Sequence, residues 1–253
     1  MIYSRKHRFL FIKGTKVGST SVEMALSRVC AEDDIVTPIT PVDELARMRA
    51  GGRGAQNYSG DRHAEQAYLA KLPSMTPDEL ATVDPPMGTF VNHMSLRDVD
   101  AVVGGIPPGT LAFGVERSPY EKVMSFANML LRFNDYRSKG NAMISNIDEL
   151  KAAIARVVES GQAPLVRNID RYRDPSGALT MRILRYDDLE NAFARLLVDL
   201  GLPPMPLPRA KQGMGSERFN PRELFEPEHL ARVNEEFADE FAALGWPRVE
   251  PVR

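Results

Sequence analysis

The sequence predicts an α/β fold, a three-layer α/β/α domain with a central parallel sheet. Three segments, 9–29, 111–133 and 181–200, each combine a short apolar run with a following helical pattern. Strands that alternate with helices in this way indicate parallel βαβ units. No repeat of fixed period is present, which argues against a solenoid.

Composition excludes several classes of protein. The 253 residues carry 32 Lys and Arg against 34 Asp and Glu, a formal net charge of −2. We expect one domain over 1–253, because a chain of this length can form a single core. The balanced charge disfavours a nucleic-acid partner, which needs a basic surface. The single cysteine, Cys30, excludes an internal disulfide and a cysteine-rich zinc site, and we expect no metal.

The N-terminal region is basic but only briefly apolar. Four apolar residues, 9–12, follow basic residues at 5–8, and Lys13 ends the run. A membrane span needs about 20 apolar residues and a signal peptide roughly 7–15. We therefore expect no membrane span and a cytoplasmic location.

The first segment has the pattern of a strand followed by a helix. The apolar run 9–12, flanked by charge, is typical of a strand buried on both faces. A polar turn follows at 13–19. Val22, Ala25, Leu26 and Val29 then recur at helical spacing and predict a helix against the sheet.

The second and third segments repeat this arrangement. Residues 111–115 predict a strand and 119–133 a helix, with Pro119 in its first turn. Residues 181–186 predict a strand, and the helix after it ends at Gly201. A further strand is expected at 89–92, and an irregular insertion at about 31–88. Other helices are expected at 41–48, 77–83, 95–103, 147–159 and 227–244.

The turn after the first strand has the composition of an anion-binding loop. Glycines let the backbone approach a phosphate closely, and a helix N-terminus offers N–H groups and a positive dipole end. A Walker A loop carries its lysine after the second glycine, whereas here Lys16 precedes Gly18 and Ser19 follows it. We therefore predict a phosphate-binding turn that is not a standard ATPase loop. A plain turn with solvated lysines is the alternative.

A second candidate site follows the strand at 111–115. Arg117 stands eight residues before Ser125, and a rise of about 1.5 Å per residue leaves Ser125 within reach of a long arginine side chain. Together they can bind one anion. Two phosphate sites on neighbouring strands predict a bis-phosphorylated ligand. The alternatives are an ion pair of Arg117 with Glu116 or Glu121, and an ordinary helix position for Ser125.

These two motifs resemble those of the sulfotransferase superfamily that uses 3′-phosphoadenosine 5′-phosphosulfate (PAPS). The carbohydrate and membrane-associated branch is the most similar. Residues 16–21 are similar to its 5′-phosphosulfate loop and 115–125 to its 3′-phosphate motif, although Ser118 stands where many members have Asn or Asp. Weaker similarities follow at 184–189 and 241–246, so the resemblance spans most of the chain.

The resemblance implies a P-loop NTPase-like sulfotransferase fold and sulfuryl transfer from PAPS to an acceptor hydroxyl or amine. It implies that Lys16 and its loop hold the 5′-phosphosulfate, and that Arg117 and Ser125 hold the 3′-phosphate. Lys16 would also stabilise charge on the leaving product, adenosine 3′,5′-bisphosphate (PAP). A late segment, 209–216, would close over the 3′-phosphate. The remaining loop residues assigned to the 5′ group are Val17, Gly18, Ser19, Thr20 and Ser21.

The resemblance also implies a catalytic base between the two motifs. His93 fits this position, and an imidazole with a pKa near 6.5 can accept a hydroxyl proton at neutral pH. A histidine bonded only to backbone is the alternative. Glu23 and His63 are further candidates for the base.

Two other functions stay open on the sequence. One is a P-loop-like small-molecule kinase that uses Mg-ATP, and the other is a non-catalytic nucleotide-binding module. The acceptor is a small molecule, a carbohydrate or a lipid, and family membership alone does not select among them. Residues 31–88 and 134–180, which we expect to shape its pocket, match no interpretable pattern.

Overall fold

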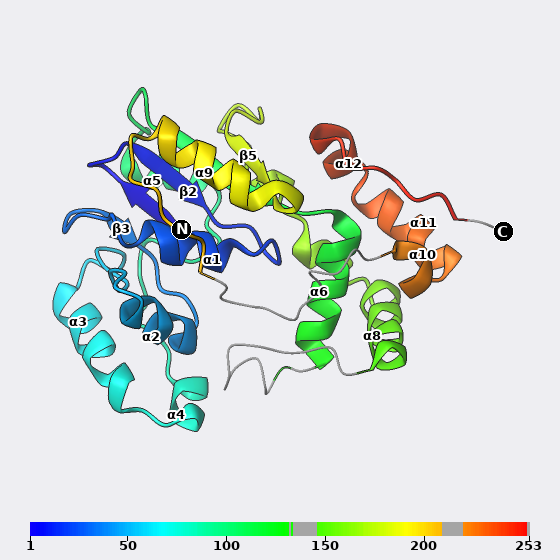
Figure 1. Ribbon diagram of the computed structural model, residues 1–253, viewed down its shortest axis with the longest axis horizontal. Coiled ribbons are helices and arrows are strands. Elements are labelled where there is room, and N and C mark those ends of the chain that lie inside the picture. Colours follow the sequence, from blue (N-terminus) through cyan, green and yellow to red (C-terminus); the bar gives the residue numbers. More distant parts are fainter. Residues whose placement is uncertain (132, 134–145, 209–219, 252–253) are drawn as a thin grey trace.

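The computed structural model describes residues 1–131, 133, 146–208 and 220–251. It has an α/β fold around one five-stranded mixed sheet of order β3-β1-β2-β4-β5 (Figure 1). Strands β2, β4 and β5 are parallel, whereas β1 runs antiparallel to both β2 and β3. The strands are β1 (Ile2–Ser4), β2 (Phe9–Ile12), β3 (Ile35–Val36), β4 (Leu111–Glu116) and β5 (Arg182–Arg185).

The mixed sheet departs from the wholly parallel sheet that the sequence predicts. The difference comes from β1, a three-residue strand that returns into β2 through the short turn at 5–8. So short a strand carries no alternation pattern by which to recognise it. The parallel part, β2-β4-β5, consists of three of the four strands that the sequence predicts.

The strand β2 is apolar throughout because both of its faces are covered. Phe9 and Phe11 pack in one cluster with α1 (Ser19–Leu26) and α9 (Leu189–Asp199). Leu10 and Ile12 point the other way, into a second cluster that includes α5 (Leu96–Val103). Side chains that alternate between two apolar layers fix the register of a strand.

The helices predicted at 41–48, 77–83, 95–103, 119–133 and 147–159 are confirmed, with small differences at their ends. The predicted helix at 227–244 is divided at Phe237, whose backbone is not helical and whose ring is fully buried. The helices concerned are α2 (Pro41–Arg49), α4 (Pro77–Thr82), α5, α6 (Pro119–Leu131), α8 (Ile147–Glu159), α11 (Pro227–Glu236) and α12 (Ala238–Leu244).

The strand predicted at 89–92 is wrong. Residues 89–93 form bends and a turn, and Phe90 N–H donates to the Tyr58 carbonyl, 3.0 Å away. His93 then has a left-handed backbone with φ 62°. Such a reversal of the chain cannot continue a strand.

Residues 31–88 contain more regular structure than the irregular insertion we expected. Besides β3, α2 and α4, they form α3 (Arg62–Lys71), which buries only Glu65 and Tyr68 and therefore shows no apolar stripe. Figure 1 shows α2, α3 and α4 grouped at one end of the molecule. Their shared apolar cluster consists of Leu45, Tyr68, Leu72 and Leu80.

A second group of helices lies at the opposite end of the molecule in Figure 1. Side chains of α6, α8, α11, α12 and the short α10 (Pro221–Leu224) share one apolar cluster. None of the described helices is long and apolar enough to cross a membrane. The described residues also form four 3-10 helices: η1 (Leu72–Ser74), η2 (Ala163–Val166), η3 (Ile169–Arg171) and η4 (Tyr186–Asp188).

Candidate functional site

The two candidate anion-binding motifs lie at the same edge of the sheet. Strands β2 and β4 pair in parallel with Ile12 opposite Gly114, so the chain leaves both at the same end. Tyr186, which follows β5, contacts both motifs. Its ring centroid lies 4.3 Å from Cζ of Arg117, and a Cβ at Gly18 would come within 2.5 Å of its Cε2. The weak similarity at 184–189 includes Tyr186 but does not indicate this role.

The turn between β2 and α1 has a strained backbone. Lys16 and Gly18 both have positive φ, 62° and 74°, and a left-handed conformation costs a residue other than glycine about 1–2 kcal/mol. Gly18 is the N-cap of α1, so no side chain caps this helix. The Ser19 hydroxyl donates to the Gly14 carbonyl, 3.0 Å away, and closes the turn on itself. The first-turn N–H groups of α1 are therefore not used by a capping side chain.

Asn168, directly before η3, and Arg171, within η3, bind the turn between β2 and α1. Asn168 Oδ1 accepts from Thr15 N–H at 2.7 Å, and Asn168 Nδ2 donates to the Thr15 carbonyl at 3.1 Å. Arg171 Nη1 donates to Thr15 Oγ1 at 2.9 Å and to Asn168 Oδ1 at 2.7 Å. We call Asn168 and Arg171 the turn clamp. Sequence reasoning missed both, because their partner is distant along the chain.

A buried charge cluster connects the turn clamp to Arg117. Lys122 Nζ lies 2.9 Å from Glu116 Oε1 and 2.5 Å from Glu240 Oε2, and all three side chains are fully buried. Glu116 also accepts from Arg117 N–H at 2.8 Å, and Glu240 accepts from Asn168 N–H at 2.5 Å. Arg117 and the turn clamp are thus both linked, through Glu116 and Glu240, to the ammonium group of Lys122.

The cluster contains two carboxylates and one ammonium group. Burial raises the pKa of Glu116 to about 7, since Lys122 only partly offsets the cost of a buried charge and Glu240 adds repulsion. One of the two carboxylates is therefore easily protonated near neutral pH.

Arg117 and Ser125 both lie in the interior, with exposed fractions of 3% and 6%. Arg117 Nη2 lies 3.4 Å from Glu121 Oε1, so the ion pair considered as an alternative is present. A phosphate that binds this guanidinium must share it with Glu121 or displace that carboxylate.

His93 lies beside the base of the turn. Its Nδ1 is 3.1 Å from the Lys13 carbonyl, and since a carbonyl only accepts, Nδ1 carries the proton and Nε2 keeps its lone pair. Burial, with the nearby charges of Lys13 and the Met1 amino group, lowers the pKa of His93 to about 3. Arg171 contributes in the same direction. The imidazole is therefore neutral at neutral pH.

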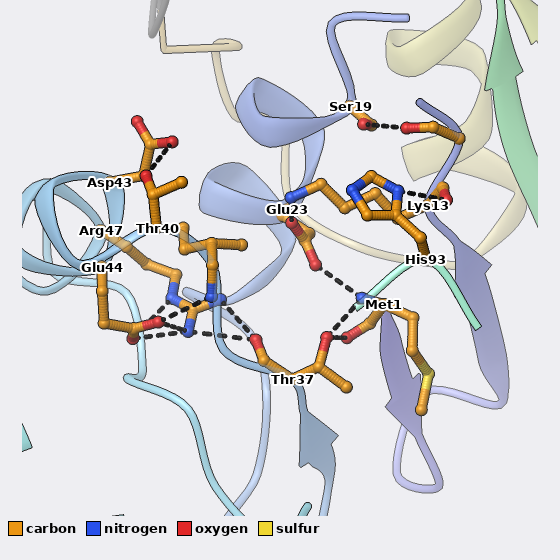
Figure 2. Close-up of polar contacts among 12 residues, drawn as sticks. Met1, Lys13, Ser19, Glu23, Thr37, Thr40, Asp43, Glu44, Arg47 and His93 are labelled. Atoms are coloured by element: carbon orange, nitrogen blue, oxygen red, sulfur yellow. Dashed lines mark hydrogen bonds and ion pairs between the residues drawn. The ribbon is translucent and has the colours of Figure 1, made fainter. Parts of the chain in front are cut away.

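The other two candidate bases are less suitable. Glu23 is fully buried between Lys13 Nζ, 2.5 Å from Oε2, and the Met1 amino group, 2.7 Å from Oε1 (Figure 2). Burial alone would raise its pKa, but Lys13, the Met1 amino group and Arg47 outweigh it and lower the pKa to about 2. Both of its oxygens are held by cations, so neither is available to an acceptor hydroxyl. His63 is exposed on α3, and within the described residues no hydrogen bond or ion pair links it to the turn.

The expected closing segment, 209–216, lies outside the described residues. No protein-family model, curated protein or solved structure matches the chain.

Proposed function

We propose that the chain is a PAPS-dependent sulfotransferase with a three-layer, P-loop NTPase-like sulfotransferase fold. One observation carries the proposal. The turn after β2 and Arg117 after β4 leave the sheet at one edge, and the ring of Tyr186 contacts both. In α/β sheets, ligands bind beyond the carboxyl ends of the strands.

The turn suits the 5′-phosphosulfate end of PAPS. It combines the uncapped N-terminus of α1 with an exposed Gly18, and both features favour close approach of an anion. After burial, the largest cause, Lys13, the Met1 amino group and Arg171 each lower the pKa of the adjacent His93 imidazole. An anionic ligand would offset these three contributions.

The 3′-phosphate end is assigned to Arg117 and Ser125. A guanidinium fixed on the Tyr186 ring is well suited to bind a phosphate. The Glu121 carboxylate lies 3.4 Å from Nη2 of Arg117, so a bound phosphate must share the guanidinium with it or displace it. Binding at this end is therefore weaker than an unopposed arginine would give.

When bound, PAPS supplies the sulfuryl group, which passes to an acceptor oxygen while that oxygen loses its proton. Nε2 of His93 receives the proton, because Nδ1 is held by the Lys13 carbonyl. Lys16 stabilises negative charge on the leaving phosphate oxygen. A bound anion would offset the part of the pKa shift of His93 that comes from Lys13, the Met1 amino group and Arg171, whereas the part that comes from burial, the largest cause, remains.

Turnover of sulfur-labelled PAPS with a panel of hydroxyl acceptors tests the function. We expect Lys16→Ala to lower kcat about 100-fold with a smaller effect on PAP binding. Arg117→Ala should mainly weaken PAP binding, by about tenfold or more. Lys6→Ala, at an exposed position in the turn at 5–8, is the control. The opposite pattern in the two variants would reject these roles.

Nucleotide binding and sulfate transfer by the wild-type protein distinguish the competing functions. A kinase would bind Mg-ATP in preference to PAP, and a non-catalytic module would bind PAP without transferring sulfate to any acceptor. Calorimetric titration with both nucleotides, followed by the transfer assay, distinguishes all three.

A further inference from the structure

We propose that the cavity lined by the residues directly before His93 holds the acceptor, and that the acceptor is a neutral alcohol with an apolar body. The inference rests on the proposed sulfuryl transfer and names its second substrate. The cavity has a volume of about 530 Å³, within the range of small-molecule sites. It is lined by Tyr58 and by residues 38–41, 80–81, 83–88 and 90–92.

One wall of the cavity leads directly to the candidate base. Phe90, Val91 and Asn92 line it, and the next residue is His93. A molecule in the cavity is therefore bounded by the chain that carries the imidazole.

A second part of the lining, residues 38–41, is fixed to the same site through buried polar contacts. It begins at Pro38, directly after Thr37, whose Oγ1 accepts from the Met1 amino group at 2.6 Å. The Met1 amino group in turn pairs with Glu23, which pairs with Lys13 (Figure 2). This chain of contacts connects the wall to the end of β2.

A buried ion pair in α2 holds that wall in place. Glu44 accepts from Ile39 N–H at 3.3 Å and pairs with the fully buried Arg47, which also donates to the Thr37 carbonyl. Figure 2 shows these groups converging on the segment that forms the wall. The cavity is therefore built into the fold rather than formed by a loose loop.

The chemistry of the lining selects against a charged or strongly polar acceptor. Most of the lining residues are proline, aliphatic or aromatic. Met87 and Val91, which line it, have exposed fractions of 96% and 50%. Among the described residues that line the cavity, Asp84 is the only charged one, and its sign repels an anionic acceptor. A neutral apolar molecule buries the most surface here at the least cost.

Two polar atoms in this lining lack partners. Tyr58 Oη and Asn92 Oδ1 are buried, and neither has a hydrogen-bond partner among the described residues. Burying a polar group without a partner costs about 1–3 kcal/mol. Both atoms are buried, so the hydroxyl of an alcohol in the cavity pairs with them only when these side chains move. Asn92 lies next to His93 in the chain.

Binding of matched ligands to the full chain tests the inference. The probe is 2-naphthaleneethanol, a neutral fluorescent alcohol, and its anionic counterpart is 2-naphthaleneacetate. We expect the alcohol to bind at least about tenfold more tightly than the acetate, and more tightly than N-acetylglucosamine. An equal or reversed preference overturns the proposal.

Two variants locate the binding site. Ala81→Phe places a ring in the cavity and should weaken binding of the alcohol about tenfold or more, whereas Ala70→Phe on the exposed part of α3 should not change it. Val91→Lys, at a half-exposed position, should reduce the preference for the alcohol over the acetate. Unchanged binding in both cavity variants, with melting temperatures equal to wild type, overturns the site.

PAP binding is measured separately on each variant. If PAP fails to bind wild-type protein while the alcohol binds in the cavity, the proposed function fails and the site remains. If PAP binds but the alcohol does not, the acceptor inference fails alone.

Discussion

The side-chain amide of Asn168 forms two hydrogen bonds with the backbone of Thr15, a residue 153 positions away in the chain. Thr15 directly precedes Lys16, whose left-handed backbone is strained. A strained residue persists only where its surroundings hold it. The clamp thus gives the turn the fixed shape that anion binding requires.

Asn168→Ala should weaken PAP binding about tenfold, because the loss of both hydrogen bonds lets the turn relax. Calorimetric titration measures this change. Asn191→Ala, on the exposed face of α9, should leave the affinity unchanged. If Asn168→Ala lowers the melting temperature but leaves the PAP affinity at the wild-type value, the clamp is structural only.

Gly18→Ala should abolish most PAP binding. The added Cβ would meet Tyr186 at 2.5 Å, and φ is +74°. Gly104 has the same φ but nothing within 4 Å of a Cβ, so Gly104→Ala isolates the backbone cost. We expect Gly104→Ala to lose about 1 kcal/mol of stability with unchanged binding. If Gly18→Ala and Gly104→Ala have the same PAP affinity, the contact with Tyr186 does not affect PAP binding.

Glu121→Gln should tighten PAP binding. The carboxylate lies 3.4 Å from Arg117 and is 27% exposed, so its charge competes with an incoming phosphate. Removing one like charge near the site is expected to improve affinity about threefold to tenfold. Glu190→Gln, exposed on α9, serves as the control in the same titration. Weaker PAP binding by Glu121→Gln would show that the ion pair supports the site rather than competing for it.

Glu116→Gln should alter how stability depends on pH. The folded-state pKa of about 7 exceeds the ordinary 4.5, mainly because of burial. The native state therefore binds more protons than the unfolded state between these values, and wild-type stability falls as the pH rises through that range. The amide side chain of Glu116→Gln does not titrate, so the variant does not lose this stability. As the pH rises from 4.5 to 8, its free energy of unfolding should increase relative to that of wild type by on the order of 3 kcal/mol.

Denaturant unfolding at several pH values measures the difference between the two proteins. The comparison cancels groups common to both, such as His93, whose depressed pKa acts in the opposite direction. A constant difference between pH 4.5 and 8 would mean that Glu116 does not change its protonation in this range.

The parts of the fold that the sequence predicts correctly have strong local patterns. The run 9–12 is apolar because β2 is covered on both faces, and α1 and α9 show apolar stripes against it. Strands β1 and β3 have three and two residues, too few for a pattern. The pattern at 89–92 is misleading because residues 90–92 line a cavity and none of the four pairs in the sheet.

The candidate site likewise contains residues that the sequence predicts and residues that it does not. Lys16, Gly18 and Arg117 stand next to predicted strands, so the topology alone places them at one edge. Asn168 and Glu240 are ordinary polar residues in sequence, and only the folded chain brings them together across 72 positions. Long-range polar contacts of this kind carry no local signal.

Comparing PAP with 5′-AMP, which lacks the 3′-phosphate, tests most directly whether two separate sites bind one bis-phosphorylated nucleotide. Calorimetry should show that wild-type protein binds PAP at least about tenfold more tightly than 5′-AMP. Arg117→Ala should lower the PAP affinity to that of 5′-AMP and leave 5′-AMP binding unchanged. Equal affinities in the wild type, or the same loss for both nucleotides in the variant, would contradict the proposal.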